Sequence, residues 1–134
     1  MTVRFVRVLL SALLLLGVSA NALAQSSSAS SLSGVVVDAD GGAIPGATVI
    51  VKNNATNVTV EAVSNATGRF SFPVLDAGTY TVTVSLTGFK TYVANDLRLL
   101  SSRPGEITAK LEIGALTETV EVKASSELVQ TQST

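Results

Sequence analysis

Residues 65–89 read NATGRFSFPVLDAGTYTVTVSLTGF, and this stretch decides the fold. Large apolar side chains occupy every second position on both sides of a polar corner at Asp76–Gly78. They are Phe70, Phe72, Val74, Tyr80, Val82, Val84 and Leu86. A period of two places them on one face of an extended chain, and the intervening β-branched threonines favour that conformation. The stretch therefore predicts two antiparallel strands and an all-β domain.

Short runs with the same character lie on both sides of this stretch. The runs before it are residues 32–37, 47–52 and 58–62, and those after it are 89–93, 106–113 and 118–123. Turn-forming residues separate them: Asp38–Gly42, Asn53–Asn57, the pair Asn95-Asp96 and a loop from Arg98 to Gly105. No segment after residue 24 has the apolar period of a helix. Strands with turns about every 8–12 residues predict an antiparallel β-sandwich of about seven strands.

The N-terminus has the layout of an export signal. Arg4 and Arg7 precede an apolar run from Val8 to Val18, and Ala22-Leu23-Ala24 has the small-x-small form of a cleavage site. The run is shorter than the roughly 20 residues of a membrane-spanning helix. A cleaved signal over residues 1–24, with Gln25 as the mature start, is therefore favoured over an uncleaved anchor.

Composition limits what the exported chain does. Without residues 1–24 the 134-residue chain keeps 110 residues, which is enough for one domain. The signal removes two of nine basic residues, so seven remain against ten acidic ones and the formal charge is −3. This balance argues against a nucleic-acid partner. An exported chain without cysteine suits a bacterial envelope better than a disulfide scaffold.

The exported part divides into three segments. A serine- and alanine-rich tract predicts a flexible leader over residues 25–31. The sandwich is predicted over residues 32–114. A polar tail follows the last alternating run, so residues 115–134 form the third segment, and no transmembrane span is expected in the mature chain.

The residues that usually perform catalysis are missing. Histidine and cysteine are absent, which removes the common general base, thiol nucleophile and zinc ligands. We therefore expect no enzyme activity, no cofactor and no metal. Asp38-Ala39-Asp40-Gly41 begins like a calcium loop but lacks the further carboxylates of one, so a turn is expected there. Three Asn-x-Thr triplets, at Asn54, Asn57 and Asn65, are likewise interpreted as turn chemistry.

The aromatic residues offer one alternative, a surface for stacking sugar rings. The alternation assigns Phe70, Phe72 and Tyr80 to the core. Tyr92 has the opposite parity to Phe89, so the pattern predicts that Tyr92 is exposed.

Several short motifs, taken in order, resemble the carboxypeptidase regulatory-like domain over about residues 31–114. They are Ser33–Asp38, Gly41–Val49, Thr67–Phe72, Leu75–Val82 and Thr87–Phe89. The resemblance implies a seven-stranded transthyretin-like or immunoglobulin-like sandwich that is not catalytic and is usually appended to another protein. It also implies a relationship to starch-binding sandwiches, so carbohydrate binding stays an alternative.

Residues 114–125 resemble the segment that joins such a domain to the plug of Oar-like TonB-dependent outer-membrane receptors. Within it the resemblance assigns a TonB-box-like segment, through which a TonB-type energising protein adds a strand to its own sheet. That segment is Glu118, Thr119, Val120, Glu121, Val122, Lys123 and Ala124. An ordinary last strand of the sandwich explains the same alternation equally well.

Two functions follow as expectations. The first is a non-catalytic accessory domain in the periplasm or outer membrane of a Gram-negative bacterium, the N-terminal part or a relative of a TonB-dependent receptor, with the energising protein or the barrel as partner. The second is a free-standing exported module that binds a glycan or a protein.

Overall fold

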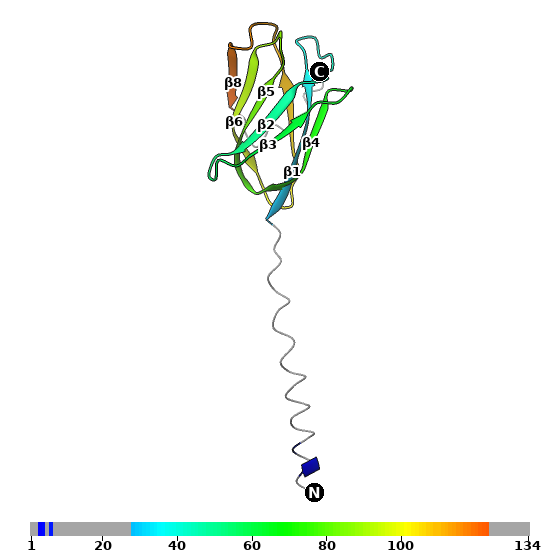
Figure 1. Ribbon diagram of the computed structural model, residues 1–134, viewed down its shortest axis with the longest axis vertical. Coiled ribbons are helices and arrows are strands. Elements are labelled where there is room, and N and C mark those ends of the chain that lie inside the picture. Colours follow the sequence, from blue (N-terminus) through cyan, green and yellow to red (C-terminus); the bar gives the residue numbers. More distant parts are fainter. Residues whose placement is uncertain (1–2, 5, 7–27, 124–134) are drawn as a thin grey trace.

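The computed structural model describes residues 3, 4, 6 and 28–123, and Figure 1 shows that residues 28–123 form a β-sandwich. The all-β fold is therefore confirmed. The strands are β1 (Ala29–Val37), β2 (Thr48–Asn53), β3 (Thr59–Val63), β4 (Arg69–Asp76), β5 (Gly78–Ser85), β6 (Thr91–Leu99), β7 (Gly105–Lys110) and β8 (Thr119–Lys123). Most of the predicted signal peptide lies outside the described residues and stays a prediction. Within the described part of the chain, no helix has the length and apolarity to cross a membrane.

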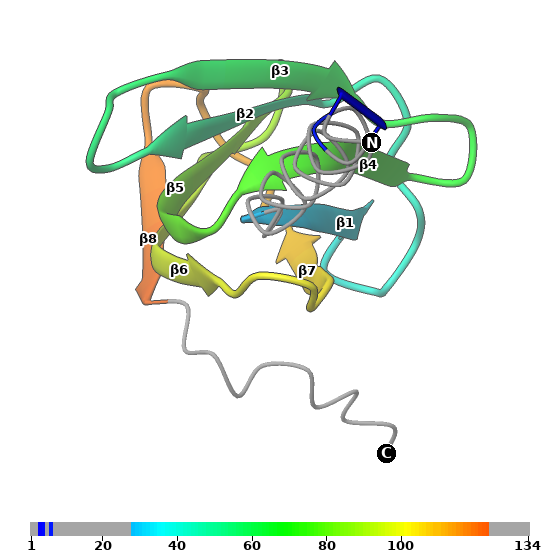
Figure 2. The same ribbon diagram turned by 90° about the horizontal axis from the view of Figure 1, so that it is seen from below.

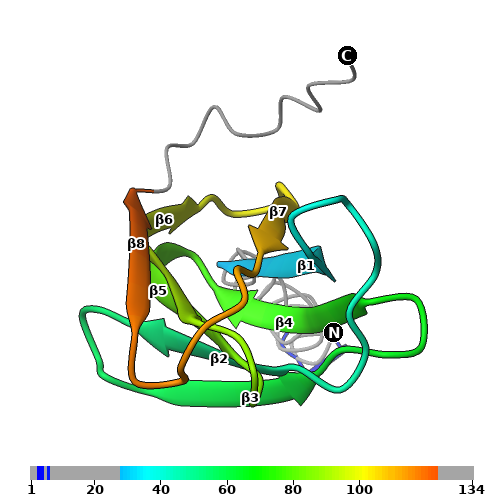
Figure 3. The ribbon, with the colours of Figure 1, turned by 90° about the horizontal axis from the view of Figure 1, so that it is seen from above.

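Two sheets make the sandwich. One has the order β4-β1-β7, and the other has the order β3-β2-β5-β6-β8. Seen end-on in Figures 2 and 3, the five-stranded sheet curves around the smaller one, with β3 and β8 at its two ends. β1 pairs with β7, and β6 with β8, in parallel. The prediction of a purely antiparallel arrangement is thus wrong for these two pairs, because in each the chain crosses over between the sheets before it returns.

The core lies between the sheets and uses the alternation seen in the sequence. Inward side chains of β1, β2, β4, β5, β6 and β7 meet there with few exposed atoms. The largest fully buried side chains are those of Leu32, Val36, Val49, Val51, Val82 and Val84 in these strands and that of Leu111 just after β7. Phe70 and Phe72 pack edge to face with ring centroids 6.1 Å apart, and both are buried as predicted. Burial of such side chains supplies most of the stability of the sandwich.

An extra residue in β4 reverses its alternation. Leu32 pairs with Phe72 but Ser30 pairs with Leu75, so β4 contains one more residue than β1 between these pairs. The bulge lies at Pro73-Val74, where a proline without an amide is tolerated. Val74 is consequently 74% exposed and Leu75 is buried. The prediction of Val74 as a core residue is wrong for this reason.

A second bulge lengthens β6. Tyr80 pairs with Leu97 but Val82 pairs with Ala94, so the extra residue falls in β6. Asp96 has a φ of 58° there. The predicted turn at residues 95–96 is therefore a bulge inside one strand, and Leu97 and Leu99 are buried beyond it instead of entering a loop. Short polar side chains tolerate this backbone conformation, which is why the sequence resembles a turn.

Two predicted turns are confirmed. Asp38 Oδ1 accepts hydrogen bonds from the amides of Asp40 and Gly42, at 2.9 and 2.8 Å. Asn65 Oδ1 accepts from the amides of Thr67 and Arg69, at 3.0 and 2.9 Å. Both carboxamide and carboxylate groups thus close turns.

The sheet edges differ in how they are protected. β4 carries Pro73, which interrupts its outer row of amides. The two outer strands of the larger sheet begin with the same triplet, Thr-Val-Glu, so Glu61 is central in β3 and Glu121 is central in β8. β1 begins at Ala29, inside the segment predicted as a flexible leader, and Ser30 is buried there and donates a hydrogen bond to the Arg103 carbonyl at 2.9 Å.

Candidate functional site

The TonB-box-like residues form the last described strand. Thr119 to Lys123 make β8, Glu118 precedes it, and Ala124 lies outside the described residues. β8 pairs with β6 over five residues, from Thr91 opposite Thr119 to Asn95 opposite Lys123. No strand among the described residues pairs with the other side of β8. The structure thus places this segment as an edge strand of the sandwich.

Side chains of β8 alternate between half-buried and exposed positions. Val120 and Val122 are half-buried and lie opposite the buried residues Tyr92 and Ala94 of β6. The other three residues of the strand are exposed: Thr119, Glu121 and Lys123. Val122 packs against the core, and the polar residues face solvent.

A cluster of contacts holds the chain just before β8. The Lys90 ammonium lies 3.4 Å from a Glu112 carboxylate oxygen and 3.7 Å from one of Glu118. Thr91 binds twice: its hydroxyl donates to the Leu116 carbonyl and its amide donates to the Glu118 carbonyl, each at 2.8 Å. These contacts fix residues 112–118 against the start of β6. These contacts leave no signal in the sequence, because Lys90 and its two glutamate partners are far apart along the chain.

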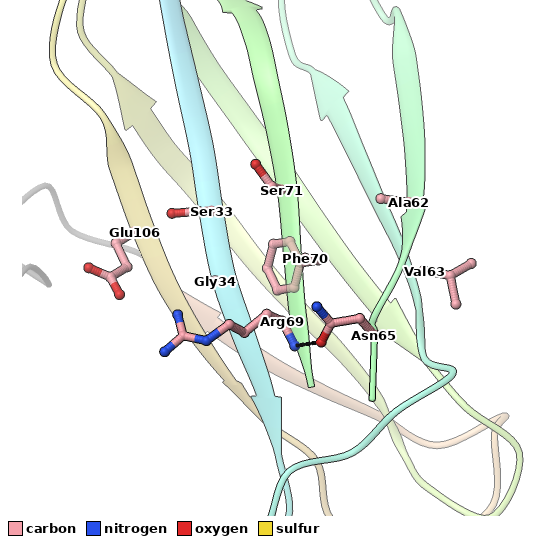
Figure 4. Close-up of a pocket in the computed structure, with 9 residues that line it drawn as sticks. All are labelled: Ser33, Gly34, Ala62, Val63, Asn65, Arg69, Phe70, Ser71 and Glu106. Atoms are coloured by element: carbon pink, nitrogen blue, oxygen red, sulfur yellow. Dashed lines mark hydrogen bonds between the residues drawn. The ribbon is translucent and has the colours of Figure 1, made fainter. Parts of the chain in front are cut away.

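A shallow groove lies on the opposite side of the sandwich. Its volume is about 410 Å³, and it runs between the open edge of β3 and the strands β4, β1 and β7. Figure 4 shows the ring of Phe70 beside Gly34 of β1. Ala62 and Val63 lie on one side of the ring, and the Arg69 side chain extends toward Glu106 on the other side. A guanidinium group, a carboxylate group and the hydroxyl groups of Ser33 and Ser71 therefore border a small apolar surface.

Tyr92 does not form part of any exposed aromatic surface. It is 7% exposed, so the prediction that it faces solvent is wrong. The prediction uses Phe89 as the reference for which face Tyr92 occupies. Phe89 forms an isolated bridge to Ile113 before β6 begins, so it does not share the alternation of that strand. Burial raises the pKa of the Tyr92 phenol above its ordinary value of 10.0. Tyr80 is buried as predicted, and its hydroxyl donates to the Asp76 carbonyl at 2.7 Å.

No group of three or more acidic side chains gathers in the described residues in a way that suits a metal ion. The Oδ1 atom of Asp38 accepts hydrogen bonds from the turn amides of Asp40 and Gly42. The four described lysines lie at exposed or half-exposed positions: Lys52, Lys90, Lys110 and Lys123. No described lysine is therefore buried beside a serine, as a lysine-activated nucleophile requires.

Comparison with known families gives one match. The model of the carboxypeptidase regulatory-like domain matches residues 31–112. No curated protein sequence matches the chain.

Solved structures share the fold at low sequence identity. The chain resembles the TIE protein of Bacillus anthracis (18% identity, TM-score 0.55, covering 63% of this chain and 16% of that one). It also resembles a "putative carbohydrate binding protein" of Bacteroides uniformis (19%, TM-score 0.52, 61% and 40%). A third likeness is to a cohesin–X-dockerin complex of Acetivibrio cellulolyticus (20%, TM-score 0.52, 63% and 58%). In each case the chain spans less than two thirds of the other protein.

Proposed function

The chain belongs to the carboxypeptidase regulatory-like domain family, and we propose from this premise that it is a non-catalytic, exported accessory domain that acts through protein contact. In this proposal it is the N-terminal periplasmic part, or a relative, of a TonB-dependent outer-membrane receptor. Its partner is the TonB-type energising protein, which pairs a strand with residues 118–124.

The observation that carries the proposal is the position of β8 at a sheet edge. The strand lies beyond the family match, which ends at residue 112, and its outer side has no partner strand in the described part of the chain. Main-chain groups along such an edge are available to an added strand, and alternate side chains supply register. The exported location rests on the signal-like N-terminus.

Proline substitution at matched sites tests the proposal. Glu121→Pro removes an amide from the outer side of β8, because the main-chain groups of Val120 and Val122, like the Glu118 carbonyl, are directed at β6. Glu61→Pro makes the same change in β3, the other outer strand with a Thr-Val-Glu triplet. We expect the purified periplasmic domain of the energising protein to capture the full chain and the Glu61→Pro variant, but not the Glu121→Pro variant. Circular dichroism must show that both variants are folded. Equal capture of all three chains would refute the TonB-box assignment.

The groove at Arg69 favours a second candidate, a carbohydrate- or protein-binding module. The fold likeness to the Bacteroides uniformis protein supports it, and Arg69, Glu106 and the neighbouring serines supply hydrogen-bonding groups. The described residues give it no exposed aromatic platform: Phe70, Phe72, Tyr80 and Tyr92 are buried and Phe89 is half-buried. Glycan-array binding that disappears in Arg69→Ala, while Arg98→Ala binds normally, would favour this candidate.

A further inference from the structure

β8 is attached less firmly than the inner strands of its sheet. It has one neighbour, β6, where each inner strand has two. None of its five residues is fully buried, and parallel pairing is slightly less stable per residue than antiparallel pairing. The matched domain, residues 31–112, already contains β1 from Ser31 onward and all of β2 to β7. The sandwich therefore has its core without β8.

The contacts just before β8 form an anchor. Lys90 and Thr91 hold Glu112, Leu116 and Glu118. After Glu118, the described strand is held only by its pairing with β6 and by its two half-buried valines. Loss of those contacts frees β8 while residues 112–118 stay in place.

The docked position also limits what a partner can reach. The Glu118 carbonyl is already bonded to the Thr91 amide, so alternate residues of β8 direct their main-chain groups at β6. Val120 and Val122 face the sandwich interior. A partner that binds both the β6-facing main-chain groups and these apolar side chains must therefore displace β8 from β6.

We infer that β8 is a releasable strand: it leaves β6 about a pivot at Glu118 while the seven other strands stay folded, and capture by a partner sheet requires this release. Release uncovers the edge of β6 and the side chain of Tyr92. The identity of the partner rests on the proposed function, but the release itself does not.

A disulfide lock tests the inference directly. Val93 and Glu121 are register partners that face away from the core, and the chain has no cysteine of its own. Val93→Cys with Glu121→Cys therefore ties β8 to β6 when oxidised. Ile50→Cys with Thr83→Cys places a matched lock between β2 and β5 of the same sheet.

Hydrogen exchange of the chain alone provides the first readout. We expect the amides of Val120 and Val122, which face β6, to exchange about 100-fold faster than those of Val82 and Val84 in β5, because β8 opens locally. Oxidation of the β6–β8 lock slows the exchange of β8, whereas oxidation of the β2–β5 lock does not. Equal exchange in β8 and β5 would overturn the inference, since β8 would then open only when the whole domain unfolds.

Capture by the purified periplasmic domain of the energising protein provides the second readout. We expect oxidation of the β6–β8 lock to reduce capture about tenfold or more and a reductant to restore it, with no change for the β2–β5 lock. Undiminished capture by the locked chain would overturn release as a requirement and leave the proposed function standing. If no form is captured, the proposed function fails, and the exchange measurement alone decides whether β8 is releasable.

Discussion

The ring of Phe70 lies over Gly34, so closely that a Cβ atom placed on Gly34 would come within 2.5 Å of the Phe70 Cζ atom. The Ile107 carbonyl blocks the same space from the other side. Gly34→Ala should therefore force Phe70 or the backbone of β7 to move, and should lower the free energy of unfolding by about 1–3 kcal/mol. Urea denaturation followed by circular dichroism measures the change.

Gly78→Ala is the matched control for this substitution. A Cβ atom there would lie 3.5 Å from the nearest atom of Asn53, which is ordinary contact distance. We expect the midpoint of unfolding to stay close to that of the parent chain. A similar loss in both variants would contradict the contact between Phe70 and Gly34 as the cause of the effect.

Ser64 joins two backbone groups inside the sandwich. Its hydroxyl accepts from the Ala47 amide at 2.9 Å and donates to the Ile44 carbonyl at 2.8 Å, and the residue is 4% exposed. Ser64→Ala should cost about 1–3 kcal/mol, because it leaves both groups buried without a partner. Thermal unfolding checks this, with the exposed Ser71→Ala as the control that should change little.

The phenol of Tyr92 should ionise later than that of a free tyrosine. Burial raises its pKa above 10.0 in the folded chain, so above that pH the unfolded chain releases a proton that the folded chain still holds. Stability from Tyr92 is therefore complete below pH 10 and falls as the pH rises toward the folded pKa. Ultraviolet titration of the parent and Tyr92→Phe chains should show that the substitution removes a phenol whose pKa lies above 10.0. A parent chain whose two tyrosines both titrate at the ordinary value would contradict the buried position of Tyr92.

Lys90→Gln should affect β8 more than the domain. Both of its ion pairs are partly exposed, so the free energy of unfolding should change by no more than about 1 kcal/mol. Amide exchange of Val120 and Val122 should nevertheless become faster, because the anchor before β8 loses its charge contacts. Lys52→Gln, on an exposed position of β2, should leave exchange in β8 unchanged.

Alternation along the chain predicts the sandwich well because each strand must place one face in a single apolar layer. Phe70, Phe72 and Tyr80 are buried as their parity indicates. The same reasoning is wrong for Val74 and mistakes the continuation of β6 for a turn, because an inserted residue exchanges the two faces of a strand. A bulge depends on which strand lies alongside, and that information is not local in sequence.

The candidate site was predictable to a lesser degree. The pattern of residues 118–123 is compatible with a strand of the domain or with a segment used by a partner, since both require alternation. The structure adds that β8 pairs in parallel with β6 and that Lys90 and Thr91 hold the chain before it. Parallel pairing and the anchor both arise from segments more than twenty residues apart, so the composition of either segment alone does not reveal them.

The glutamates at the centres of β3 and β8 have a consequence for how copies of this chain meet. Two β3 strands paired antiparallel about their centres would place one Glu61 carboxylate directly against the other, and two β8 strands would do the same with Glu121. Like charges in that position repel, so growth of the sheets into ribbons is discouraged. A foreign strand with a lysine or arginine at that position meets attraction instead. The open edges of β3 and β8 therefore disfavour pairing with a second copy of this chain and favour pairing with a basic strand of another protein.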